Sequence, residues 1–141
     1  QLALAQHFGL PVQRTGGRAR VVQQALQRRQ TFGQHLPAQA QFNQGALVAL
    51  DRDTGKPKWN VRLRSYTWSS PTVVEGVVVV GDASGAIFVR DAATGASLLT
   101  DAEGNPAEYV SVKATIEASP LIWHDQIFIG IRGGGLVCLG N

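Results

Sequence analysis

Cysteine and methionine are nearly absent from this chain of 141 residues, which has one cysteine and no methionine. Cys138 has no second cysteine in the chain to pair with, so an internal disulfide is excluded. It lies in an apolar segment, where we expect a buried and inert thiol. No stretch approaches the roughly eighteen apolar residues of a membrane span. Neither His-x-x-x-His nor Cys-x-x-Cys spacing occurs, so we predict no catalytic, cofactor or metal site.

Aspartate and glutamate are missing from the first 44 residues. That segment carries five arginines, a net charge of +5, and eleven glutamines, whereas residues 45–141 hold eight basic residues against ten acidic ones. Such a change in composition marks a boundary. We therefore predict two parts: a Gln- and Arg-rich arm at residues 1–44, and a second part at residues 45–141.

Within the arm, residues 18–32 can form an amphipathic helix that ends before Gly33. Val22 and Leu26 would share one face of it, and Phe32 would continue that face. The sequence therefore predicts a basic, partly helical arm.

Three kinds of partner suit such a helix: an anionic membrane surface, nucleic acid or protein. Arginines without interleaved aromatic residues, and without a known nucleic-acid motif, argue against nucleic acid. The apolar surface is small for firm membrane binding, although peripheral contact is an alternative. We expect the helix to dock on a protein partner or on the rest of its own polypeptide. Val22, Leu26 and Phe32 would face inward, with Arg28 and Arg29 toward carboxylates or solvent.

Residues 45–141 contain an internal repeat. The segment Gly45–Lys56 returns forty positions later as Gly85–Ala96, and a third copy begins at Gly135. Between these copies, Ser69–Gly81 is echoed by residues 118–130. A repeat of this length means that one small structural unit is used several times.

Each unit has the pattern of short antiparallel strands. Apolar residues alternate with their neighbours in the period of two that a half-buried strand needs, and turn residues follow about every ten positions. The Asp-x-x-Thr-Gly segments predict tight turns, and Glu75-Gly76 predicts a hairpin turn. Nine candidate strands, four to a complete unit, are typical of propeller blades.

These residues resemble the pyrroloquinoline-quinone-like repeat, a family of β-propeller blades. Gly45–Trp59 matches its Gly-x-Leu-Tyr-Ala-Leu-Asp-x-x-Thr-Gly-Lys-x-x-Trp pattern, and Ser69–Gly81 matches Ser-Ser-Pro-x-Val-x-x-Gly-x-Val-Tyr-Val-Gly. The resemblance implies an all-β fold: a partial β-propeller of about two four-stranded antiparallel blades at residues 45–141, preceded by the arm. Because a closed ring needs roughly four to eight blades, we expect this chain to be a segment of a larger propeller.

The resemblance also assigns roles to single residues. It implies that Trp59 docks one blade on the next, and Leu99 at the matching position of the second unit implies weaker or different packing there. Trp68, before the innermost strand, is open between packing and partner recognition. The segment Asp101–Lys113 lengthens the second unit, and it is either a surface loop or a binding element.

Two functions are compatible with such blades. Quinoprotein dehydrogenases of the family hold their cofactor with a tryptophan platform, a pair of adjacent cysteines and calcium ligands, which this chain does not match. We therefore predict a non-enzymatic scaffold or protein-binding module of a bacterial cell-envelope assembly, with no cofactor. The alternative is a fragment of a quinoprotein dehydrogenase whose cofactor and calcium ligands lie on other blades. A location in the cell envelope or periplasm is implied by the resemblance alone.

Overall fold

The computed structural model describes the backbone of residues 19–24 and the whole of residues 44–140. All regular structure in these ranges is β-strand. The described residues therefore include no helix that is long and apolar enough to cross a membrane. The twelve strands are β1 (Ala19–Gln24), β2 (Ala46–Asp51), β3 (Pro57–Arg62), β4 (Thr72–Val74), β5 (Val77–Gly81), β6 (Ala86–Asp91), β7 (Leu99–Thr100), β8 (Pro106–Ala107), β9 (Val110–Ser111), β10 (Leu121–Trp123), β11 (Gln126–Ile131) and β12 (Gly135–Leu139).

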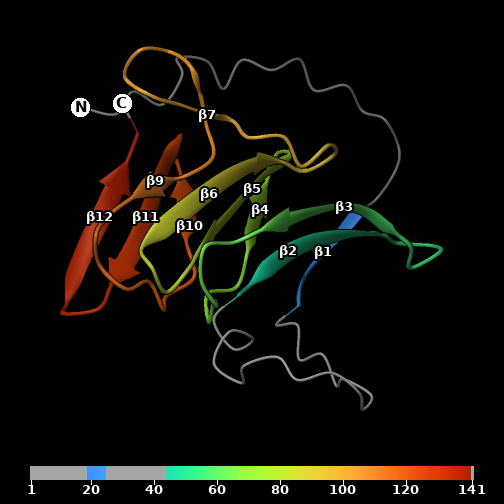
Figure 1. Ribbon diagram of the computed structural model, residues 1–141, viewed down its shortest axis with the longest axis horizontal. Helices are drawn as coiled ribbons and strands as arrows, with labels where there is room; N and C mark the ends of the chain where they lie inside the picture. The colour runs from blue at the N-terminus through green and yellow to red at the C-terminus, as the bar shows by residue number, and fades with distance from the viewer. Residues whose placement is uncertain (1–18, 25–43, 141) are drawn as a thin grey trace, which may run out of the picture.

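Three antiparallel sheets lie side by side (Figure 1). The first sheet has the order β1-β2-β3, the second β4-β5-β6-β9, and the third β10-β11-β12, while β7 and β8 form a separate pair. Only the second sheet has four strands among the described residues. The expectation of an all-β partial propeller of antiparallel sheets is confirmed, with one four-stranded sheet and two sheets of three described strands.

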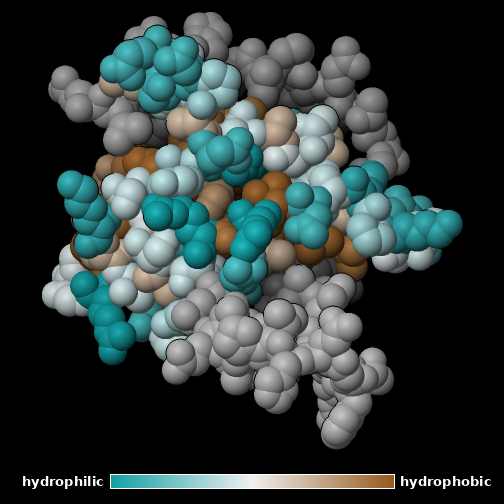
Figure 2. Space-filling model, in the orientation of Figure 1, coloured by the Kyte–Doolittle hydropathy of each residue, from teal (hydrophilic) through white to brown (hydrophobic). Residues whose placement is uncertain are grey.

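Two apolar clusters hold the sheets together. The first interface, between the first and second sheets, contains Leu47, Leu63, Val78, Val80, Ala86 and Phe88. The second interface, between the second and third sheets, contains Val77, Val79, Ile87, Val89, Leu99, Val110, Ile116, Ile127 and Ile129. All five residues of β5 are buried because this strand is covered on both faces, as its continuous apolar run predicts. Figure 2 shows apolar residues between the sheets and hydrophilic ones at the tip of the β2–β3 hairpin.

The hairpin turns take the conformations that their residues allow. Glu75 and Gly76 both have positive φ, and so do His124 and Asp125 in the matching turn between β10 and β11. Two consecutive residues of this kind join antiparallel strands in the sense of their natural twist. In the first Asp-x-x-Thr-Gly turn, one carboxylate oxygen of Asp51 accepts hydrogen bonds from the N–H of Asp53 and from both the N–H and the hydroxyl of Thr54.

These turn bonds predict a pH dependence of folding. The pKa of Asp51 lies below its ordinary value of 3.8 because Thr54 donates a backbone and a side-chain bond to the carboxylate. The pKa of Asp101 is lowered in the same way, first by the N–H of Asn105. A lowered native pKa contributes stability that is complete above the ordinary value and is lost as the pH falls through the lowered one.

The free energy of unfolding, measured by urea titration at several pH values, should therefore decline as the pH drops below about 4. A double variant Asp51→Asn, Asp101→Asn should show a shallower decline. Asp53→Asn is the matched control, because the Asp53 carboxylate accepts none of the bonds given above. An equally steep decline in the double variant and in the control would contradict this origin of the acid sensitivity.

The predicted helix at residues 18–32 is wrong over Ala19–Gln24, which form β1. This strand pairs antiparallel with β2, with Val22 opposite Val48. The physical reason is the edge of β2, whose backbone N–H and C=O groups gain partners that a helix could not supply. Two adjacent β-branched residues, Val21 and Val22, also favour a strand. Residues 25–32 of the predicted helix lie outside the described residues.

The fourth strand of the second sheet does not follow its neighbour directly in the chain, as β3 follows β2 in the first sheet. Arg90 of β6 bridges Ser97, yet Ile87, three residues away, pairs with Val110. In the first sheet, Leu50 pairs with Pro57 and Leu47 with Val61. A step of three residues along β2 therefore matches a step of four along β3, and the two strands stay paired. The chain thus leaves the second sheet after Leu98, forms the β7–β8 hairpin, and returns as β9.

The segment Asp101–Lys113, for which the sequence allows a surface loop or a binding element, is partly ordered by contacts with the second sheet. Glu108, on the returning stretch, accepts a bond of 2.6 Å from the nearly buried guanidinium of Arg90. The neighbouring Tyr109 ring lies 5.9 Å from that of Phe88, measured between centroids. The end of the excursion thus packs on the outer rim of the first interface.

The expectation of a buried thiol at Cys138 is wrong, because this residue is exposed. The register explains the difference. Ile127 and Ile129 face the second sheet, and their partners across β12 are Leu139 and Val137. Side chains alternate along a strand, so Cys138 and Leu136 point to the opposite face of the third sheet, where Leu136 is 72% exposed.

Candidate interaction surface

The connection between β3 and β4 is an extended segment whose side chains alternate between inside and outside. Leu63, Thr67 and Ser69 are buried, and Ser65 is half-buried. The intervening side chains point outward, with Arg64 exposed, Tyr66 half-buried and Trp68 64% exposed. We call Arg64, Tyr66 and Trp68 the outward strip.

The inward residues anchor this connection to both neighbouring sheets. The N–H of Leu63 donates to the carbonyl of Gly45 in the first sheet, at 2.9 Å. The Thr67 hydroxyl donates to the carbonyl of Gly81 in the second sheet, at 2.6 Å, and accepts from the N–H of Ser69. Because successive inward residues are held, the outward strip is fixed in place without regular secondary structure.

Asp82 is the central anchor. Its side chain is fully buried, and its two oxygens accept four hydrogen bonds: from the N–H of Ser65, the N–H and hydroxyl of Ser84, and the N–H of Ala86. Among the described residues, no lysine or arginine forms an ion pair with it. The charge is therefore stabilised by directed donors, which ties the connection to the β5–β6 turn.

Aromatic and cationic groups pair along the outward strip. The rings of Tyr66 and Trp68 lie 5.3 Å apart with a 55° angle between their planes. The Arg64 guanidinium carbon lies 4.6 Å from the centre of the Tyr109 ring. Tryptophan, tyrosine and arginine are the residues that most often dominate binding at protein interfaces. The strip thus has the composition of a protein-binding surface.

The next connection, between β9 and β10, provides an internal comparison. The N–H of Arg132 donates to the carbonyl of Thr115, as that of Ala83 donates to Tyr66. This match places Lys113, Thr115 and Glu117 at the positions of the strip residues. Glu117 forms an ion pair with Arg132 at 3.4 Å. The aromatic strip is therefore a feature of the first connection, and the second connection is polar.

Trp59 lies in the first interface, where the family resemblance places it. Its indole N–H donates to the carbonyl of Ala92, at 3.0 Å, in the turn after β6. Gly95 of the same turn lies against the ring, since a Cβ there would approach the indole to 2.8 Å. The side chain is half-buried and packs against the first cluster.

The residues predicted to contact a partner have different outcomes. Trp68 is exposed and belongs to the outward strip. Val22 lies in β1, opposite Val48, and its side chain is not described. Leu26, Arg28, Arg29 and Phe32 lie outside the described residues. Sequence reasoning missed Arg64 and Tyr66. The inward residues Ser65, Thr67 and Ser69 are polar, so residues 63–69 do not show the alternation of apolar and polar side chains that marks a half-buried segment.

Comparison with known proteins now adds the family. A family model described as "Outer membrane protein assembly factor BamB" matches residues 14–140. This chain belongs to that family. The resemblance to pyrroloquinoline-quinone-like repeats is thereby confirmed, and the match includes part of the arm as well as the blades.

Among solved structures, the crystal structure of BamB from Moraxella catarrhalis is similar to this chain, with 18% sequence identity and a TM-score of 0.48. The alignment covers 69% of this chain and 26% of that protein, so the chain spans about a quarter of that BamB. No curated protein matches the chain in sequence. The outward strip and the Trp59 contact thus lie within the part of the chain that the BamB family model matches.

Proposed function

We propose that this chain is part of a non-enzymatic β-propeller scaffold of the bacterial cell envelope, which holds a protein partner within an outer-membrane assembly complex. The observation that carries the proposal is the outward strip: an exposed tryptophan beside a tyrosine and an arginine, held in place from both sides. A rigid surface costs little conformational entropy on binding, which favours recognition by such residues. The family description supports the role in assembly and the location.

The strip provides the first test. Trp68→Ala should weaken partner binding roughly tenfold or more, because an exposed aromatic anchor is the kind of residue that dominates interface energy. The free energy of unfolding of the Trp68→Ala variant should fall by no more than about 0.5 kcal/mol, because the Trp68 side chain is largely in solvent. Co-purification from envelope membranes, quantified against the wild type, measures the first effect, and urea denaturation measures the second.

Glu117→Ala is the matched control, because Glu117 occupies the position of Trp68 in the polar connection. It should leave partner recovery unchanged. If Trp68→Ala retained full recovery while remaining folded, the strip would not be the contact surface. Contact through Leu26, Phe32, Arg28 and Arg29 remains a separate proposal, since it concerns residues outside the described ranges.

A further inference from the structure

Arg90 of β6 is a buried cation whose presence is not explained by stability. It lies in the first interface beside Phe88 and is only 3% exposed, and its Nε–H has no acceptor within the described part of the chain. In the first unit of the repeat, Leu50 occupies the same position, since Arg90 follows Gly85 as Leu50 follows Gly45. A buried ion pair is often no more stabilising than apolar residues of similar volume. An arginine at this position therefore indicates a role other than stability.

The partner of Arg90 is the stretch of chain that returns from the β7–β8 excursion. One Nη group of Arg90 donates to the Glu108 carboxylate at 2.6 Å and to the Glu108 carbonyl at 2.9 Å. The Glu108 side chain is 73% exposed, so without Arg90 the carboxylate would be hydrated and free to move. The buried guanidinium therefore fixes both the side chain and the backbone of Glu108, immediately before Tyr109.

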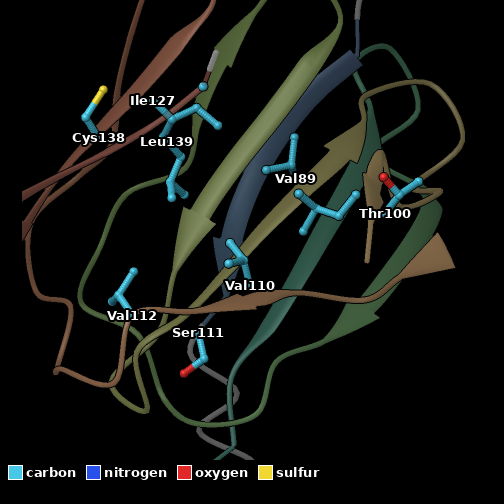
Figure 3. A pocket seen from close by; sticks show the side chains of 10 residues that line it. Val89, Thr100, Val110, Ser111, Val112, Ile127, Cys138 and Leu139 are labelled. Carbon is cyan, nitrogen blue, oxygen red and sulfur yellow. The ribbon is translucent and has the colours of Figure 1, made fainter. Parts of the chain in front are cut away.

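Tyr109 is thereby held at the rim of the first interface. Its ring lies beside that of Phe88 and packs on the first cluster. The next residue, Val110, lies on the opposite side of the chain, where its side chain lines a pocket of the second interface together with Val89 (Figure 3). Since Val110 pairs with Ile87 in the second sheet, the alternation of side chains along the strand fixes the direction of the Tyr109 ring.

The Tyr109 ring supports Arg64 of the outward strip. The guanidinium carbon of Arg64 lies 4.6 Å from the ring centre, within the range in which a cation is attracted to an aromatic face. Among the described residues, no carboxylate forms an ion pair with Arg64 and no hydrogen bond holds its guanidinium. The ring is therefore the contact that fixes this arginine. A side chain that is already fixed loses less conformational entropy on binding.

We propose that Arg90, Glu108 and Tyr109 are positioning residues of the interaction surface. Arg90 fixes Glu108, the adjacent Tyr109 ring is held in place, and the ring preorganises Arg64 for the protein partner. The excursion at residues 101–113 thus serves the surface through its returning stretch. This role rests on the proposed function, because it assigns residues of the second unit to the same surface. The positioning of Arg64 itself is a property of the free protein, so it can be measured without the partner.

The Nε–H signal of Arg64 in a heteronuclear NMR spectrum of the purified protein measures the positioning, and its loss in Arg64→Lys assigns it. In the wild type we expect a signal shifted by the ring current of Tyr109, with a heteronuclear NOE near that of the backbone. Arg90→Leu, which introduces the residue of the first unit, should move the signal toward that of solvent-exposed arginines and lower the NOE. The free energy of unfolding of this variant should not fall. Arg52→Leu, the same exchange at an exposed arginine after β2, is the matched control and should change neither quantity.

Two substitutions of Tyr109 separate the aromatic contact from simple packing. Tyr109→Leu keeps an apolar contact with Phe88 and loses the ring, whereas Tyr109→Phe keeps the ring. The probe is the envelope protein whose recovery from solubilised membranes Trp68→Ala reduces, and the measured quantity is the bait concentration that gives half-maximal recovery. Tyr109→Leu and Arg90→Leu should raise this concentration roughly three- to tenfold, because one long side chain must then be ordered on binding. Tyr109→Phe and Arg52→Leu should leave it unchanged.

An Arg64 signal that is unchanged in folded Arg90→Leu and Tyr109→Leu variants would overturn the inference, whatever the binding result. Unchanged half-maximal recovery with Tyr109→Leu would also overturn it, provided that Trp68→Ala reduces recovery in the same experiment. If Trp68→Ala reduced no recovery, the proposed function would fall. A mobile Arg64 in Arg90→Leu would then still support the positioning, and an immobile one would overturn it. Where Arg90→Leu fails to fold, Glu108→Ala, which removes the carboxylate acceptor, replaces it under the same criteria.

Discussion

Replacement of Asp82 by alanine is expected to destabilise the fold by about 3–5 kcal/mol, because it empties a fully buried position and leaves one buried and two partly buried N–H groups without their acceptor. The donors that lose their partner are the N–H groups of Ser65, Ser84 and Ala86 and the hydroxyl of Ser84. These donors belong to two segments, so the loss of stability is expected to affect the connection between β3 and β4 as well as the β5–β6 turn. Equilibrium urea denaturation measures the loss.

Two variants separate this effect from the simple removal of a charge. Asp82→Asn keeps one acceptor oxygen and should cost less than Asp82→Ala. Asp53→Ala removes an exposed carboxylate and should change the free energy of unfolding by no more than about 0.5 kcal/mol. If Asp82→Ala were as mild as Asp53→Ala, the donors would have other acceptors, and the anchoring role of Asp82 would be wrong.

Trp59→Ala is the second substitution with a large expected effect, a loss of about 3 kcal/mol for an aromatic side chain packed at the rim of an interface. Three contacts disappear together: the packing on Gly95, the apolar contact with the first cluster, and the bond to the Ala92 carbonyl. Since these contacts join the first sheet to the second, the variant should also reduce the cooperativity of unfolding. Urea denaturation followed by circular dichroism records both quantities.

Smaller substitutions divide the Trp59 contribution. Trp59→Phe retains most of the apolar contact and loses the N–H donor, at a cost of about 1 kcal/mol. Thr54→Ala removes the hydroxyl that donates to Asp51 in the turn before β3, again at about 1 kcal/mol. A larger loss from Thr54→Ala than from Trp59→Ala would show that Trp59 is not the residue that docks the sheets.

The repeat made most strands predictable from the sequence. The strands at residues 46–62 and 72–91, and their turns, follow from period-two alternation and from glycine at positions of positive φ, which are local properties. The error at residues 18–32 had a different cause. The spacing of Val22 and Leu26 fits a helix, whereas the strand at 19–24 depends on pairing with β2, a contact across more than twenty residues that a local pattern does not contain.

The candidate surface was only partly predictable for the same reason. Trp68 could be singled out as a large aromatic residue in a connection, but its exposure depends on which neighbours are anchored. The inward positions are occupied by Ser65, Thr67 and Ser69, which in a sequence resemble solvent-facing residues. Ser65 is held inward by its N–H, which donates to the Asp82 carboxylate, and Thr67 by its hydroxyl, which donates to the carbonyl of Gly81. Both acceptors lie at the end of β5, in the next sheet.

The alternation of residues 63–69 limits how the length of this connection can change. Deleting one residue would exchange the two sides, so that Arg64, Tyr66 and Trp68 would meet Asp82 while their anchors faced solvent. Deleting or inserting two would preserve the sides and only shorten or lengthen the strip. The length of the β7–β8 excursion is not restricted to even changes, because its hairpin leaves the second sheet and the chain returns to it at β9. Among related chains, length changes at the connection should therefore be even, and those in the excursion should be both odd and even.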